Sequence, residues 1–220
     1  MYPVILEPLY LYCERVGPGL LQEPLNLMSS LVFAPLGWAI WRGSAGLPGL
    51  RVLAVLTLLV APASVALHLW PTLLTVSPVV GLILAILLQC FYLANREIMA
   101  MSRRMALACV LVVLPFAAVG LPLLAAERSA LTSLAFVAPP ILVLGYAAAV
   151  RDRWPATARG LLIAALVLVL GISLRTLDLP MCAAWPHGTQ FLWKLLAALF
   201  LAQMARVYRA HMLAGPGGGG

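Results

Sequence analysis

Long apolar stretches separated by short polar turns set the pattern of this chain of 220 residues. A helix needs about 20 mostly apolar residues to cross the hydrocarbon core of a bilayer, which is roughly 30 Å thick. Seven stretches approach this length, and together they account for most of the chain. They are Glu23–Trp41, Leu50–Leu69, Val76–Asn95, Met105–Ala125, Ser129–Val150, Gly160–Thr176 and His187–Tyr208. The pattern therefore predicts an all-α, polytopic membrane protein, a bundle of seven transmembrane helices.

The connections between the apolar stretches are short and rich in glycine and proline, as in GSAGLPG, RDRWPATARG and PMCAAWPHG. Such residues are typical of turns, and no soluble domain interrupts the helices. We therefore expect one membrane domain over residues 1–213. Residues 214–220 are glycine-rich, so we expect a disordered tail there.

Composition agrees with this assignment, because 64% of the residues are hydrophobic and only 10% are charged. A soluble domain of this size could not cover so much apolar surface. The net charge of +7 could suggest a nucleic-acid partner. Most arginines lie in short loops, however, where membrane topology places them, so we expect no nucleic-acid binding. The sequence does not indicate an oligomeric state.

The arginines are divided unequally between the two sides of the predicted bundle, which sets its orientation. Ten lie in the loops after the first, third and fifth helices or near the C-terminus, against three on the opposite side. The ten are Arg42, Arg51, Arg96, Arg103, Arg104, Arg151, Arg153, Arg159, Arg206 and Arg209, and the three are Arg15, Arg128 and Arg175. Because positive loops stay in the cytoplasm, we expect the N-terminus outside, in the periplasm or a lumen, and the C-terminus in the cytoplasm.

This orientation gathers the unusual polar residues of the helices near the outer surface. They are Glu23, Asn26, His68, Asp178, Gln190 and Lys194. Lys194 is the single lysine of the chain and lies within an apolar stretch. A buried ionisable group in a membrane requires a partner, a wet cavity or a function, unless its side chain snorkels to the headgroups.

The second predicted helix carries Thr57, Ser64 and His68 on one face, at spacings of seven and four. A serine one turn before a histidine can donate to an oxyanion or orient the imidazole. Alternatively, Ser64 bonds a carbonyl of its own helix and His68 caps the helix end.

The last predicted helix carries His187, Gln190 and Lys194 on one stripe. Two side chains four residues apart can grip one metal ion. An amide oxygen binds Zn²⁺ weakly, however, and a charged ammonium repels it, so Lys194 would have to be neutral to act as a ligand.

Oxygen-bearing side chains also cluster at the start of the first helix. Glu23, Asn26 and Ser30 lie there at i, i+3 and i+7, and Glu14 precedes them in the outer tail. Carboxylate and amide oxygens are ligands for Ca²⁺, although two carboxylates make a weak site. Alternatively, Glu23 only stabilises the helix N-terminus.

Two of the four cysteines, Cys13 and Cys182, lie outside in this topology. The outer face of a membrane is oxidising, so these two can form a disulfide. Cys90 and Cys109 lie within apolar stretches and are expected to be buried.

Three segments resemble the alkaline ceramidase family and the wider CREST superfamily of seven-helix membrane hydrolases. YCERVGPGLLQEPLNLMSSLVF resembles the acidic, cysteine-bearing tail and first helix of that family. SVALH resembles its Ser-x-x-x-His motif at the end of the second helix. RTLDLPMC, followed by GTQFLWKLL, resembles the Asp, Cys and Gly-Thr-His-Phe-Leu-Trp-His segment of the bacterial branch.

The resemblance implies a zinc-dependent hydrolase that converts ceramide, or a similar lipid amide, to a sphingoid base and a fatty acid. In that family three histidines hold a zinc ion that lowers the pKa of the attacking water. His68 matches one ligand and Ser64 the assisting serine. The stretch after His68 contains no acid where the family has an aspartate, and we predict Asp178 as the second catalytic residue.

The chain departs from the family pattern at the metal. Gln190 and Lys194 stand at the other two zinc-ligand positions, and His187 is a possible substitute one turn further out. An ammonium at residue 194 can supply the charge of the missing ion, paired with Asp178. The resemblance also implies that Glu14, Glu23 and Asn26 form a calcium-like site, although Leu11 replaces its leading aspartate, and that Cys13 pairs with Cys182.

The sequence therefore leaves three functions open, each with a membrane lipid or ceramide-like amide as partner. The first is the zinc-dependent hydrolase of the family. The second is a non-catalytic relative that binds lipid or acts like a receptor. The third is metal-free chemistry in which Lys194 acts as a base or a nucleophile.

Overall fold

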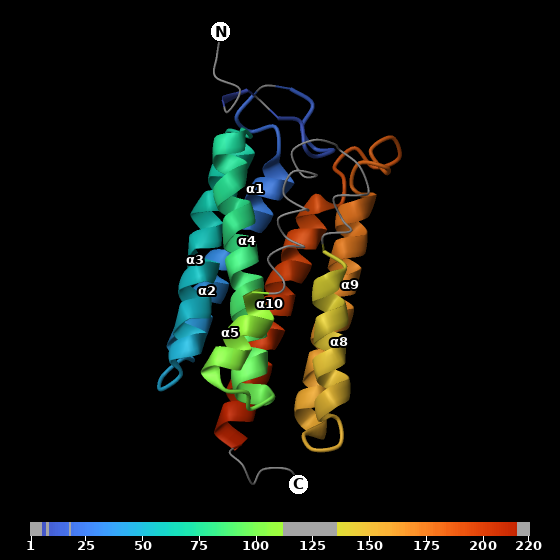
Figure 1. The fold of residues 1–220 in the computed structure, drawn as a ribbon. Helices are drawn as coiled ribbons and strands as arrows, with labels where there is room; N and C mark the ends of the chain where they lie inside the picture. Colours follow the sequence, from blue (N-terminus) through green and yellow to red (C-terminus); the bar gives the residue numbers. More distant parts are fainter. Residues whose placement is uncertain (1–5, 8, 18, 112–135, 215–220) are drawn as a thin grey trace.

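The computed structural model describes residues 6–7, 9–17, 19–111 and 136–214, and the secondary structure of this part of the chain is helical. The helices run side by side along one axis, with the chain passing up and down between them (Figure 1). In order they are α1 (Pro24–Ser30), α2 (Phe33–Arg42), α3 (Pro48–Leu69), α4 (Leu73–Leu93), the π-helical turn η2 (Ala94–Ile98), α5 (Arg103–Leu111), α8 (Ala138–Val150), α9 (Pro155–Leu177) and α10 (Gln190–Ala214).

Five helical stretches of the described chain are long and apolar enough to cross a membrane. They are Pro24–Arg42, which contains α1 and α2, then Pro48–Leu69, Leu73–Ile98, Pro155–Leu177 and Gln190–Ala214. For the described residues, the prediction of an all-helical chain with several helices able to cross a membrane is confirmed, and the count of seven stays a prediction. Two further predicted helices, Met105–Ala125 and Ser129–Val150, lie partly outside the described residues, and only α5 and α8 represent them.

Proline residues define where several helices begin. Pro24, Pro48 and Pro155 each occupy the first turn of a helix, where a missing N–H costs nothing and the fixed φ suits the helix. The start of the last helix differs from the prediction, because α10 begins at Gln190 and His187 lies in the preceding turn. His187 therefore does not share a helix stripe with Lys194.

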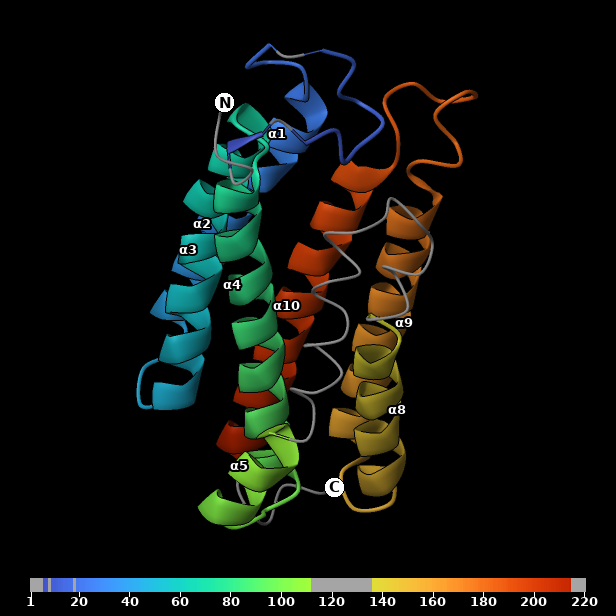
Figure 2. The same ribbon diagram turned by 45° about the horizontal axis from the view of Figure 1, so that its top comes forward.

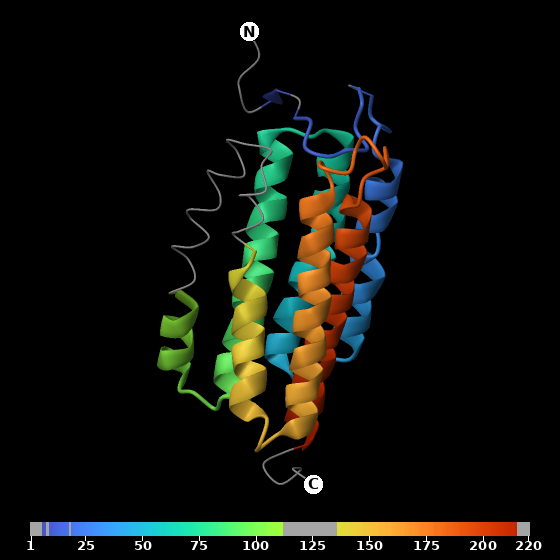
Figure 3. The ribbon, with the colours of Figure 1, turned by 90° about the vertical axis from the view of Figure 1, so that its right-hand side faces the viewer.

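The helix packing brings α1, the N-terminal tail and the connection between α9 and α10 together at one end of the bundle. Helix α2 packs on α3 and α3 on α4, while α9 packs against both α8 and α10. The short helix α1 contacts α3 and α10, and so bridges the two groups. The N-terminal tail and the connection between α9 and α10 lie at this same end, and the last turn of α10 lies at the other (Figures 1 and 2). The side view shows α9 and α10 as neighbours along their length (Figure 3).

Glycines allow the helices to approach closely, as is common between helices in membranes. A Cβ added at Gly37 of α2 would lie 2.7 Å from Leu58 Cγ and 2.9 Å from the Leu58 backbone nitrogen on α3. A Cβ at Gly171 of α9 would lie 2.9 Å from the Trp193 ring of α10. Both pairs of helices therefore depend on the absence of a side chain at these positions.

This packing predicts that Gly37→Val destabilises the bundle while Gly145→Val does not. The first substitution forces α2 away from α3 and should cost about 1–3 kcal/mol of unfolding free energy, the usual effect of overpacking. A Cβ added at Gly145 of α8 would meet no heavy atom of the described residues within 4 Å, so this position is the matched control. Thermal unfolding of both variants in detergent tests this, and equal midpoints would contradict the close packing of α2 on α3.

Candidate functional site

The polar centre of the structure is a row of buried ionisable groups that starts at Glu23, where only 1% of the residue is exposed. Its Oε1 accepts a hydrogen bond from Arg15 Nε at 2.5 Å, and its Oε2 lies 2.6 Å from His68 Nδ1. The Arg15 guanidinium also donates to the backbone carbonyl of His68 at 2.6 Å. These contacts fasten the N-terminal tail to the end of α3.

Lys194 continues the row from the opposite helix. Its Nζ is hydrogen-bonded to His68 Nε2, to the Asn26 carbonyl at 2.6 Å and to Ser30 Oγ at 3.0 Å. A lysine ammonium carries three donors, and here it meets three acceptors. With Lys194 charged, the Nε2 atom of His68 is the acceptor and its Nδ1–H donates to Glu23. The lysine is 6% exposed, so its side chain points inward and does not snorkel to the headgroups.

These residues do not suit a zinc ion. Lys194 Nζ lies against the ring nitrogen of His68 that a metal would need, and a charged ammonium repels a metal cation. Within the described chain, no three His, Cys, Asp or Glu side chains are grouped so that they could hold a metal. His187, the substitute ligand that we predicted, is exposed and does not line the cavity beside Lys194.

The predicted calcium-like residues lie together, but other groups of the protein occupy their oxygens. The Glu14 carboxylate accepts the backbone N–H groups of Leu25 and Asn26 at 2.7 and 2.9 Å, and so caps the start of α1. The Arg15 guanidinium lies on Glu23, where a calcium ion would have to bind. Among the described residues, Asn26 Oδ1 is buried without a hydrogen-bond partner.

The surroundings of Glu23 keep it charged. Burial raises its pKa, but the hydrogen bonds and positive charges of His68 and Arg15 outweigh burial and hold the pKa of Glu23 below its ordinary value. Tyr12 covers the site from the tail, with its ring centroid 5.4 Å from that of His68. Burial raises the pKa of Tyr12 to about 12, so the phenol stays neutral.

Asp178 lines the cavity beside Lys194, and its predicted catalytic role stays a prediction. We expected an ion pair with Lys194, but in the described structure the Asp178 carboxylate accepts backbone N–H groups. It binds those of Thr189 and Gln190 at 2.7 and 2.8 Å and that of Cys13 at 3.1 Å. Two of these donors belong to the start of α10, so the carboxylate caps this helix, where a negative charge is favourable.

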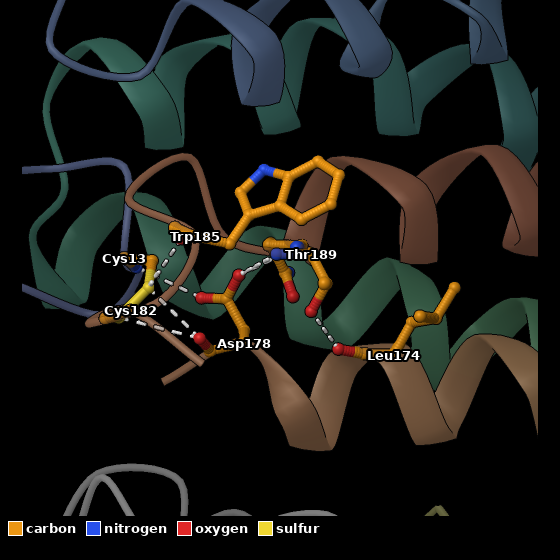
Figure 4. Close-up of a disulfide and its surroundings, with 7 residues drawn as sticks. Cys13, Leu174, Asp178, Cys182, Trp185 and Thr189 are labelled. Carbon is orange, nitrogen blue, oxygen red and sulfur yellow. Dashed lines mark hydrogen bonds between the residues drawn. A yellow bond between two sulfur atoms is a disulfide. The ribbon is translucent and has the colours of Figure 1, made fainter. Parts of the chain in front are cut away.

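A disulfide holds the same region from the other side. Cys13 of the tail and Cys182 of the α9–α10 connection are bonded, with their Cα atoms 5.4 Å apart. Figure 4 shows the pair beside Asp178, with Thr189 donating its hydroxyl proton to the carbonyl of Leu174. The tail, the end of α9 and the start of α10 are therefore joined into one unit.

Gly188 is required where these segments meet. Its φ of +63° lies in the left-handed region, which favours glycine. A Cβ at this position would collide with Asp178 Oδ1 and would lie 2.6 Å from Cys13 Cβ. The turn before α10 can therefore close onto Asp178 only with glycine at residue 188.

Ser64 faces a hydroxyl of another helix. Its Oγ lies 2.8 Å from Ser30 Oγ on α1. Thr57, two turns earlier on α3, instead donates to the Leu53 carbonyl of its own helix at 2.8 Å. Of the two alternatives for Ser64, the described contacts favour a position within the site over a bond to its own helix.

A cavity of about 1000 Å³ opens beside these groups, a size at the upper end of ordinary ligand pockets. Ser64, His68, Gln190 and Lys194 line it near the end of the bundle that carries the tail. Deeper along the helices its walls are apolar and include Val60, Leu87, Leu168, Phe200 and Leu201. Leu201 lies seven residues beyond Lys194 on α10, about 10 Å further down the helix axis.

Two participants were not predicted from the sequence. Arg15 counted only as one of the outer arginines, although it lies beside Glu14 and within ten residues of Glu23. Ser30 shares the seven-residue spacing with Glu23, which indicates a common helix face, but the spacing does not show that it contacts Lys194. Both roles depend on contacts between segments, which spacing within one helix does not reveal.

No family model, curated protein or solved structure matches this chain. The resemblance to the alkaline ceramidases therefore rests on the sequence segments given above.

The buried row predicts that Glu23→Gln is strongly destabilising. Removing the carboxylate leaves Arg15 and His68 without their anionic partner, a change that typically costs about 3–5 kcal/mol. Glu7→Gln, at an exposed position of the tail, is the matched control. Thermal unfolding in detergent at neutral pH measures both, and similar midpoints would contradict the role of Glu23.

The lowered pKa of Glu23 also predicts a pH dependence. The stabilisation is complete above the ordinary glutamate pKa of 4.5 and is lost as the pH falls through the lower pKa of the folded state. The unfolding midpoint of the wild type should therefore drop more steeply below pH 4.5 than that of Glu23→Gln. Parallel pH profiles would show that Glu23 does not make this contribution.

Proposed function

We propose that this chain is a ceramidase-like membrane protein that binds a long-chain lipid, such as ceramide or another acyl amide, in the cavity beside Lys194. The motif resemblance supports the lipid class. The proposal includes a seven-helix bundle, with the two helices that the described residues represent only in part completing the count. It does not include the zinc-dependent hydrolysis typical of the family.

The cavity carries this proposal. Its walls are apolar along the helices, while its outer end presents the hydroxyl of Ser64, the amide of Gln190 and the amine of Lys194. Such a gradient matches an amphipathic lipid, whose acyl chain needs apolar walls and whose amide or hydroxyl groups need hydrogen-bond partners.

Lys194 favours lipid binding over metal-dependent hydrolysis. The resemblance places a zinc ligand at this residue, but the lysine makes three hydrogen bonds to protein acceptors, one of them to His68. The Lys194 ammonium thus holds α10 against α1 and α3, at the place where the family has a metal ion.

An external location of the site is part of the proposal. The ten-to-three distribution of arginines favours an outer N-terminus and a cytoplasmic C-terminus. The disulfide between Cys13 and Cys182 supports the same orientation, because disulfides persist in oxidising compartments.

Filling the cavity should weaken lipid binding. Ala197 lines the cavity one turn below Lys194, so Ala197→Trp should place an indole in the space of the acyl chain. We expect binding of a fluorescent ceramide, followed by anisotropy in detergent, to weaken by about tenfold or more, or 1.4 kcal/mol. Leu199→Trp on the exposed side of the same helix should bind as the wild type does. Equal affinities of both variants and the wild type would refute binding in this cavity.

A further inference from the structure

We propose that Ser64 is a nucleophile that accepts an acyl group from the bound lipid, with Lys194 as its general base acting through Ser30. The chain would then hydrolyse long-chain acyl esters or amides without a metal. This inference rests on the proposed lipid binding and adds a reaction to it.

A continuous line of hydrogen bonds connects the three side chains. Ser64 Oγ lies 2.8 Å from Ser30 Oγ, and Ser30 Oγ lies 3.0 Å from Lys194 Nζ. Both distances lie within the reach required for proton transfer. The residues come from three helices, α3, α1 and α10, so the bundle itself assembles the line.

Exposure to the cavity distinguishes the roles of the two serines. Ser64 and Lys194 line the cavity, whereas Ser30 is fully buried behind them, with 0% exposure. A lipid carbonyl in the cavity can therefore meet Ser64 Oγ, while Ser30 is shielded from it. Ser30 is suited to pass a proton and Ser64 to attack.

The contacts around Lys194 aim its amine at Ser30. The Asn26 carbonyl and His68 Nε2 hold Nζ from two other directions. In the reacting form the amine is neutral, and its lone pair points to the Ser30 hydroxyl. In the described structure the Ser30 hydroxyl donates to the Asn26 carbonyl at 2.7 Å, so for the reaction it turns to the amine, 3.0 Å away. Ser30 then donates to Lys194, and Ser64 donates to Ser30. A serine activated by a nearby lysine base is a known variant of the serine nucleophile.

Three other hydroxyls of the described helices bond a carbonyl of their own helix. Ser29 donates to the Asn26 carbonyl, Ser173 to the Val169 carbonyl and Thr57 to the Leu53 carbonyl. Ser30 also donates to the Asn26 carbonyl, but it contacts Ser64 Oγ and Lys194 Nζ as well. Ser64 differs because its partner hydroxyl leads to an amine.

Acylation transfers the acyl group of the lipid to Ser64. Ser64 Oγ forms a bond to the lipid carbonyl carbon, its proton moves to Ser30, and the Ser30 proton moves to Lys194 Nζ. The bond from the carbonyl carbon to the leaving amine or alcohol then breaks, and Lys194, which lines the cavity, returns the proton to that group. Gln190 lines the same end of the cavity, and its amide N–H is the type of donor that stabilises an oxyanion.

Water completes the reaction. Its oxygen bonds to the acyl carbon and its proton passes to Lys194, which lines the cavity. The bond to Ser64 Oγ breaks, and Ser64 regains its proton from Lys194 through Ser30. The products are a fatty acid and an amine or alcohol, and no group is oxidised or reduced.

Covalent labelling tests this inference directly. Purified wild-type protein in lipid nanodiscs is treated with a long-chain alkyl fluorophosphonate in the presence of EDTA, and the modified peptide is mapped by mass spectrometry. We expect the label on Ser64 and none after Ser64→Ala. Ser30→Ala should slow labelling by about 10²–10⁴-fold, the typical contribution of general acid–base catalysis.

Ser29→Ala is the matched control for Ser30→Ala. It removes a neighbouring hydroxyl of α1 that shares the Asn26 carbonyl but touches neither Ser64 nor Lys194. Its labelling rate should equal that of the wild type. Equal slowing in both variants would contradict the proton relay through Ser30. A label at any residue other than Ser64 would contradict the assignment of Ser64 as the nucleophile. Both conclusions hold whether or not Ser64→Ala folds.

A parallel measurement of fluorescent ceramide binding separates this inference from the proposed function. If the protein binds ceramide but no residue is labelled, Ser64 is not a nucleophile and the proposed lipid binding stands. If the protein neither binds ceramide nor is labelled, both proposals are contradicted. Release of a long-chain acyl group from a 4-nitrophenyl ester in EDTA, abolished by Ser64→Ala, would support the inference. Hydrolysis that requires added zinc and survives Ser64→Ala would contradict it.

Discussion

The hydrogen bond between the amine of Lys194 and the imidazole of His68 is the contact on which the rest of this structure depends. It joins α10 to α3 near the end of the bundle that carries the tail, and Glu23 and Arg15 extend it to the tail. Buried charges are costly in a membrane unless they are paired and fully hydrogen-bonded. The alternation of cationic and anionic groups, with an imidazole between them, meets this condition without an exogenous ion.

The segments outside the bundle hold that contact in place. Asp178 fixes the first N–H groups of α10, and the disulfide of Cys13 fixes the tail to the connection before it. Because Lys194 lies only one turn beyond Gln190, the position of its amine depends on where α10 begins. The tail residues are therefore part of the site, although they lie outside the helices.

Much of the architecture could be predicted from the sequence, because the length of an apolar stretch decides whether a helix can cross a bilayer. The predicted topology also indicated that the unusual polar residues of the helices gather at one end of the bundle. The contacts of Asp178 could not be predicted in this way. A carboxylate near a lysine suggests an ion pair, but the Asp178 carboxylate accepts hydrogen bonds from the backbone N–H groups of Thr189 and Gln190. The contact of Ser30 with Lys194 also escaped prediction. It depends on how α1 is rotated against α10, and periodicity within one helix does not contain that rotation.

Lys194 lies against the ring nitrogen of His68 that a metal ion would need, and we therefore expect no zinc at this place. Zinc content, measured by mass spectrometry after equilibration of the purified protein with excess zinc and removal of free ions, tests it most directly. We expect far less than one zinc per chain in the wild type and no change on His68→Ala. Stoichiometric zinc that is lost on His68→Ala would contradict the claim.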